Sequence, residues 1–269
     1  LRLSDGHLHI EPLEGQLPGG PFEIHFDFNP NQPTTPISFV AHAPGLALKP
    51  LLVVLGLPDD DTGALEVDAD LHSSGDTLRA IAAGLNGHLG LALVNGTVDN
   101  RLLAYSLDEL LHDAKLPAAI GGATGHSDVR CFAFRADANH GIATMRAFML
   151  DMTHVRVTGA GTINLADETL ELRLRPLVKI AGRGVVIPVH IDGPLLAPRT
   201  QSDTSAAAAE TSLTTRFASR AGPFTPLLGA LAGERLSGTA DTGDCGSALA
   251  LARGGRSASF PAPPKQEKG

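Results

Sequence analysis

Phe22-Glu23-Ile24-His25-Phe26-Asp27-Phe28 alternates apolar and polar side chains without a break. Successive side chains of a β-strand point to opposite faces, so this stretch predicts a strand with one apolar and one polar face. The same alternation returns at 65–71, 89–93, 163–165, 170–174 and 185–191. Turn-forming residues such as Asn95-Gly96 and Asn139-His140-Gly141 lie between these stretches. Strands at this density, joined by short turns, predict an antiparallel sheet.

Helical patterns are few by comparison. Short helices are expected at 76–83, at 106–114, where a serine precedes acidic residues, and in the Ala-rich segment 205–218. The expected fold is therefore all-β and mainly antiparallel, with a few short helices. We expect a β-rich domain over 1–200, a helical or irregular extension over 201–252, and a disordered tail over 253–269, where Gly, Ser, Pro and Lys dominate.

The apolar faces of these strands are the main candidate functional feature. An apolar sheet face must be covered by a second sheet, a helix or a ligand. The sheet therefore either closes as a sandwich or curves into a groove with an apolar interior, and the sequence leaves both open. If it is a groove, an acyl chain lying along it gains about 0.8 kcal/mol per buried methylene. The candidate lining residues are Phe22, Ile24, Phe26, Phe28, Leu65, Val67, Leu71, Leu170, Leu172, Leu174, Val185, Ile187, Val189 and Ile191.

Composition argues against several classes of partner. Aromatic residues make up 4% of the chain and Trp is absent, whereas proteins that bind single-stranded nucleic acid stack bases on aromatic side chains. The net charge is −8, and nucleic-acid binding needs a concentrated basic face. We therefore expect no nucleic-acid partner. The chain begins at Leu1 without Met, which leads us to expect a piece of a longer protein and leaves open a membrane anchor upstream.

The two cysteines, Cys131 and Cys245, are too far apart in sequence for a CxxC redox site or a zinc knuckle. They either pair in an oxidising compartment or are two isolated buried thiols. Neither reading predicts a cofactor.

The segment Asp5-Gly6-His7-Leu8-His9 resembles the Asp-x-His-x-His strand end of metal-dependent amidohydrolases. Alternation places His7 and His9 on one strand face, which suits shared metal ligation. That hydrolase fold needs about eight strand–helix units, and this chain offers few helices. We therefore interpret both residues as solvent-facing strand histidines and predict no metal site. The chain also lacks a Gly-x-Ser-x-Gly motif and a phosphate-binding loop, so we expect no enzyme activity.

A series of short phrases, taken in order, resembles the AsmA family. They are Leu8-His9-Ile10-Glu11-Pro12-Leu13 with Gly19-Gly20, then 78–90, 95–99, 129–141, 157–165, 168–172 with Arg175-Pro176, and 187–195 with Pro198. Each phrase is mostly Gly, Pro and alternation, and their order carries the resemblance. It implies a periplasm-facing protein of Gram-negative bacteria, anchored in the inner membrane, without catalytic residues. It also implies a link to outer-membrane assembly and to phospholipid passage along a hydrophobic groove.

Three functions therefore stay open at this point. The first is non-enzymatic binding or conduction of phospholipid along a β groove between the two membranes. The second is an assembly factor that contacts outer-membrane or other envelope proteins without carrying lipid. The third, favoured least, is a metal-dependent amidohydrolase that uses His7 and His9.

Overall fold

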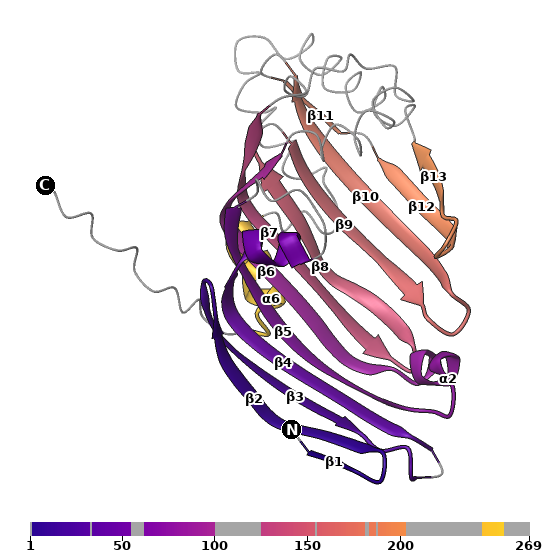
Figure 1. Ribbon diagram of the computed structural model, residues 1–269. Coiled ribbons are helices and arrows are strands. Elements are labelled where there is room, and N and C mark those ends of the chain that lie inside the picture. The colour runs from indigo at the N-terminus through magenta and orange to yellow at the C-terminus, as the bar shows by residue number, and fades with distance from the viewer. Residues whose placement is uncertain are drawn as a thin grey trace, which may run out of the picture.

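The computed structural model describes residues 2–32, 34–54, 62–99, 125–153, 155–180, 183–186, 188–202 and 244–255. These residues form one curved antiparallel sheet of thirteen strands, which lie side by side in chain order (Figure 1). Each strand pairs with its neighbours in sequence, except that β10 pairs with both β11 and β12. The sheet is open, since its path begins at β1 and ends at β13.

The first half of the sheet is β1 (Arg2–Ser4), β2 (His7–Leu17), β3 (Gly20–Phe28), β4 (Pro36–Ala47), β5 (Thr62–Ser74) and β6 (Asn86–Asp99). The second half is β7 (His126–Asn139), β8 (Ile142–Met152), β9 (Val155–Asn164), β10 (Thr169–Ile180), β11 (Arg183–Val186), β12 (Val189–Pro194) and β13 (Arg199–Ser202). Three short helices accompany it: α1 (Leu48–Val54), α2 (Leu78–Ala83) and α6 (Cys245–Ala252).

The predicted all-β antiparallel class is confirmed, and of its two forms the described residues show one open layer rather than a sandwich. The helix expected at 76–83 is α2, which Thr77 caps by accepting a hydrogen bond from the Ala80 amide. The helices expected at 106–114 and 205–218 lie outside the described residues. Helix α1 was not predicted. Helix α6 lies at the end of the helical or irregular extension expected over 201–252, and a turn at 253–255 follows it.

The stretch 185–191, expected as one strand, is divided between β11 and β12. The partner of β10 changes here, because Leu174 pairs with Val189 of β12 and Leu177 pairs with Val186 of β11. Pro176 lies between these two positions inside β10, and proline has no N–H to donate to a ladder. It therefore marks a change of partner rather than the end of the strand.

Bulges keep the apolar side chains on one face where the sequence breaks its alternation. The register shifts between Ile10 and Leu13, and again between Ala43 and Leu46. Each interval is three residues instead of two, and the extra residue in a bulge restores the face that simple alternation would lose. Each bulge contains a proline, and bulges are among the few positions in a sheet where proline occurs.

Gly159 and Gly161 of β9 allow β10 to come close. A Cβ on Gly161 would lie 2.2 Å from the Glu171 carbonyl oxygen, and one on Gly159 would lie 2.6 Å from Leu174 Cδ2. Close approach of the neighbouring strand therefore explains why glycine occurs inside β9.

Helix α6 packs on the sheet although it is far from β6, β7 and β8 in sequence. Its Ala248, Leu249 and Ala252 are buried against Ala92 and Met149, among other residues of these strands. A Cβ on Gly90 would lie 1.9 Å from the Ala252 carbonyl oxygen, so only glycine permits this approach. At the helix C-terminus, Arg253 donates two 2.7 Å hydrogen bonds to the Glu66 carboxylate, and both side chains are nearly buried.

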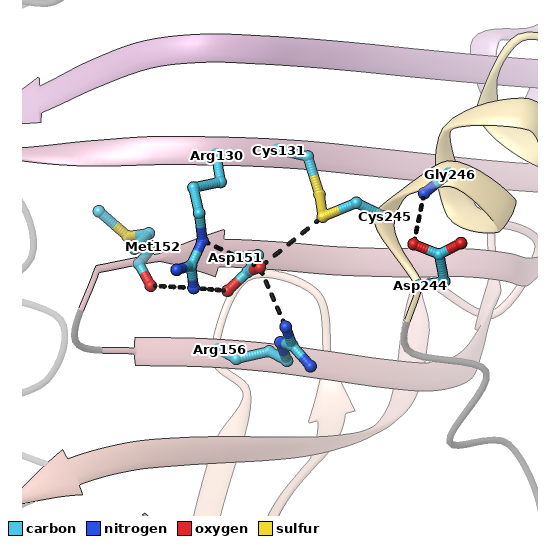
Figure 2. A network of polar contacts seen from close by, with 8 residues as sticks. All are labelled: Arg130, Cys131, Asp151, Met152, Arg156, Asp244, Cys245 and Gly246. Atoms are coloured by element: carbon cyan, nitrogen blue, oxygen red, sulfur yellow. Dashed lines mark hydrogen bonds and ion pairs between the residues drawn. A yellow bond between two sulfur atoms is a disulfide. The ribbon is translucent and has the colours of Figure 1, made fainter. Parts of the chain in front are cut away.

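A disulfide fixes the other end of α6, because Cys245 is bonded to Cys131 of β7. The structure thus settles the alternative left open by the sequence. Beside this bond lies Asp151, which is 4% exposed and accepts hydrogen bonds from Arg130 and Arg156 (Figure 2). Burial alone raises the pKa of Asp151, but the two guanidinium groups outweigh it and hold the pKa below its usual value.

The Cys131–Cys245 disulfide should contribute strongly to stability, because it closes a loop across 114 positions of sequence. Replacing both cysteines with alanine should lower the free energy of unfolding by about 2–4 kcal/mol. Denaturant unfolding of oxidised wild type, reduced wild type and the double variant measures this. Reduction should reproduce the effect of the substitutions. A double variant as stable as the oxidised wild type would contradict this view of how α6 is held.

Asp151→Asn should lower the free energy of unfolding by about 1.5–3 kcal/mol at pH 7, because it weakens hydrogen bonds between charged groups at a buried site. The folded pKa lies below the unfolded one, so the stabilisation from Asp151 is complete above about pH 4. It disappears as the pH falls through the folded pKa, and the variant and wild type should converge there. Asp128→Asn, at an exposed position of β7, is the charge-matched control. A constant difference from pH 7 down to pH 2 would refute the assignment.

Candidate functional site

The strand register divides the sheet into an apolar face and a polar face. Residues that are Cα partners lie on the same face, so the pairings can be followed from strand to strand. One such row runs from β2 to β12 and holds Ile10, Phe26, Phe39, Leu71, Gly87, Ala138, Ala143, Ile163, Leu170 and Gly193. A second runs from β4 to β10 and holds Leu46, Leu65, Leu93, Phe132, Leu150, Val157 and Pro176. Neither row contains a polar side chain.

The opposite, polar face carries charged and hydroxyl groups in the adjacent row. That row runs from β3 to β13 and holds His25, Val40, Asp70, His88, Asp137, Thr144, Thr162, Glu171, Asp192 and Arg199. Helix α6 lies on this face, because it packs on Ala92, Cys131 and Met149, which alternate with the second apolar row. The two faces therefore differ in chemistry over nearly the whole width of the sheet.

The predicted lining residues whose side chains the structure describes all lie on the apolar face. They are Phe22, Ile24, Phe26, Phe28, Leu65, Val67, Leu71, Leu170, Leu172, Leu174, Val189 and Ile191. Val185 belongs to β11 without a described side chain, and Ile187 lies outside the described residues. Among the twelve placed side chains Val189 is buried and the others are half-buried. A sealed core buries such residues fully, so this face resembles a contact surface for an apolar ligand.

Helix α1 covers only a limited part of the apolar face. Leu48, its first residue, packs on a cluster that contains Leu93 and Met152, with Leu65 and Leu150 at its margin. Within α1, Leu52 is buried and Val53 is 56% exposed. Helix α2 meets the same face at its rim, where Ser73 Oγ of β5 donates a hydrogen bond to the Ile81 carbonyl. No helix in the described ranges is both long enough and apolar enough to cross a membrane.

The polar face brings the two sequence-predicted histidines together with a third residue. His7 Nε2 and His9 Nδ1 each lie 2.8 Å from Asp27 Oδ2, and His9 Nε2 lies 2.6 Å from Glu11 Oε2. Hydrogen bonding to Asp27, and to a smaller extent to Glu11, raises the pKa of His9. Hydrogen bonds from His7 and His9 lower the pKa of Asp27. The two histidines are partly exposed to solvent and also have carboxylate partners.

Sequence reasoning identified His7 and His9 but missed Asp27 and Glu11. Asp27 is the register partner of His9 across β2 and β3. Glu11 lies in the bulge that follows Ile10. The 22–28 alternation already put Asp27 at a polar position. Only the pairing register of β2 and β3 places it opposite His9.

Comparison of the sequence with known proteins identifies one family. The sequence model of the AsmA family matches residues 1–148 of this 269-residue chain. The AsmA family protein YhjG of Escherichia coli (strain K12) is 28% identical over 180 residues, which cover 65% of this chain and 25% of that protein. The chain thus spans about a quarter of the length of that relative. No solved structure matches. Because the family model covers more than half of the chain, this protein belongs to the AsmA family.

Proposed function

We propose that this chain is a non-enzymatic, phospholipid-binding segment of a cell-envelope protein. The observation that carries the proposal is the apolar face, on which complete cross-strand rows lack any polar side chain. Membership in the AsmA family supports an envelope-associated role. In the full-length protein we place the segment in the periplasm, tethered to the inner membrane, where it binds or conducts phospholipid between the two membranes.

The dimensions of the apolar face suit acyl chains. A strand of about 14 residues at about 3.3 Å per residue is about 46 Å long. The row from Ile10 to Gly193 crosses ten strands, which at about 4.8 Å between neighbours spans about 43 Å. Each leaflet of a bilayer contributes about 15 Å of hydrocarbon, so an acyl chain fits along the face in either direction. Ten buried methylenes would contribute about 8 kcal/mol before the costs of ordering.

The face also offers side chains that hold an acyl chain without fixing one position. Phe, Leu, Ile and Ala alternate along the rows, and no described side chain in them requires a hydrogen-bonding partner. Apolar contact is non-directional, so a chain can slide along such a surface at little cost. The lipid headgroup then stays at an edge of the sheet, in water.

The disulfide supports the proposed compartment. Disulfides persist in oxidising environments such as the bacterial periplasm and are rare in the cytosol. The Cys131–Cys245 bond joins α6 to β7 and is part of the packed structure. An assembly factor in the same compartment is the second candidate. The open apolar layer favours lipid over that candidate, because an assembly factor that carries no lipid could close its apolar faces in a dry sandwich.

Paired substitutions on neighbouring residues of the same strands test this proposal. Phe26→Asn with Leu172→Asn places amides on the apolar face, and His25→Asn with Glu171→Asn is the matched control on the polar face. Protein exported to the periplasm of a Gram-negative host is purified and analysed by native mass spectrometry and lipid extraction. Wild type and control should retain phospholipid. The apolar-face variant should retain about tenfold less, which corresponds to about 1.4 kcal/mol of lost contact.

Circular dichroism confirms that both variants keep the β fold before their lipid content is compared. Equal retention by the two variants would refute the apolar face as the binding site. Wild type that carries no phospholipid, and acquires none from vesicles, would favour the assembly-factor function instead.

A further inference from the structure

The structure brings three metal-ligating groups together at the β2–β3 end of the polar face. His7 and His9 project from one face of β2, and Asp27 lies opposite His9 on β3. His7 Nε2, His9 Nδ1 and Asp27 Oδ2 all lie within 4.8 Å of one another. Two imidazole nitrogens and one carboxylate oxygen form a ligand set that suits Zn²⁺.

We propose that His7, His9 and Asp27 bind a divalent transition-metal ion of the Zn²⁺ class, with water in the remaining coordination position. The site lies on the polar face and is therefore independent of lipid binding on the opposite face.

The arrangement of His9 and Glu11 provides a second argument. Metal-bound histidine usually donates its other ring N–H to a carboxylate or carbonyl, which fixes the tautomer. Here Glu11 Oε2 lies 2.6 Å from His9 Nε2, while His9 Nδ1 faces Asp27. Glu11 follows His9 by two positions, and side chains two positions apart on a strand lie on the same face.

The cluster needs either a proton or a metal ion between its acceptors. If His9 donates from Nε2 to Glu11, the lone pair of Nδ1 points at a carboxylate oxygen 2.8 Å away. Two acceptors at this distance repel each other unless a proton or a metal ion lies between them. His7 Nε2 meets the same oxygen at 2.8 Å, so one ion there satisfies all three groups.

The three ligand atoms must rearrange to admit the ion. Tetrahedral Zn²⁺ with ligands at about 2.0–2.1 Å separates those ligands by about 3.3 Å, so the two 2.8 Å contacts to Asp27 must open by about 0.5 Å. The separation of His7 Nε2 and His9 Nδ1, which is within 4.8 Å, must reach the same value. The side chains of His7, His9 and Asp27 are 35%, 37% and 37% exposed, which leaves a path from solvent. Asp27 also borders a shallow pocket of about 310 Å³ together with Ser38 and His72.

Arg2 opposes metal binding to some degree. It is the register partner of His9 on β1 and therefore lies on the polar face beside the cluster. The carboxylates of Asp27 and Glu11 outnumber this one positive charge. We therefore expect a site that binds its ion reversibly.

The test is Zn²⁺ titration of the untagged chain by calorimetry, with Co²⁺ absorption spectra as a report on coordination geometry. Wild type should bind one ion per chain and give the intense visible bands of tetrahedral Co²⁺. His9→Gln and Asp27→Asn should each weaken binding at least tenfold. Glu11→Gln should weaken it by about 10–100-fold through the loss of its hydrogen bond to His9.

His25→Gln is the matched control, because His25 is 38% exposed and pairs with Glu23 at 2.7 Å on the same strand as Asp27. It should leave both affinity and spectrum unchanged, and thermal unfolding confirms that each variant is folded. Absence of stoichiometric Zn²⁺ binding by wild type would overturn the proposal. So would an equal loss of affinity in His25→Gln and His9→Gln.

Discussion

The division of the sheet into an apolar and a polar face depends on a strand register that continues from strand to strand. Every strand in the described part pairs with a neighbour, and a slip of one residue at any junction would reverse the faces of all strands beyond it. Instead the apolar rows continue from β2 to β12. The bulges at 10–13 and 43–46 correct the sequence where its alternation breaks. One face is therefore predominantly apolar, and the other is polar except where α6 packs on it.

The two faces of the sheet have different roles. The polar face carries the contacts that fix the architecture, including the docking of α6 through the Cys131–Cys245 disulfide and the Arg253–Glu66 ion pair. It also carries the proposed metal site, which joins β2 to β3 near one edge of the sheet. The apolar face is left to contact an apolar ligand. Because α6 and its contacts lie on the polar side, the proposed binding of lipid on the other side would not disturb them.

The sequence predicted features that depend on local pattern and missed those that depend on distant pairing. Alternation identified Phe22–Phe28 and Leu170–Leu174 as parts of strands, and their side chains lie on one face as expected. Alternation does not reveal which residue lies opposite another, so Asp27 was not placed beside His9. The disulfide spans 114 positions, and α6 is eight residues long, too short to stand out in sequence. Its stability comes from packing on β6, β7 and β8.

Trp fluorescence reports directly whether the apolar face contacts lipid hydrocarbon. The chain contains no Trp, so Phe39→Trp and Val40→Trp each introduce a single probe on opposite faces of β4. Each variant is mixed with phosphatidylethanolamine and phosphatidylglycerol vesicles that carry bromine atoms on their acyl chains. The Trp at position 39 should be strongly quenched, and the Trp at position 40 should be quenched little. Equal quenching of both probes, or none at 39, would contradict lipid contact at the apolar face.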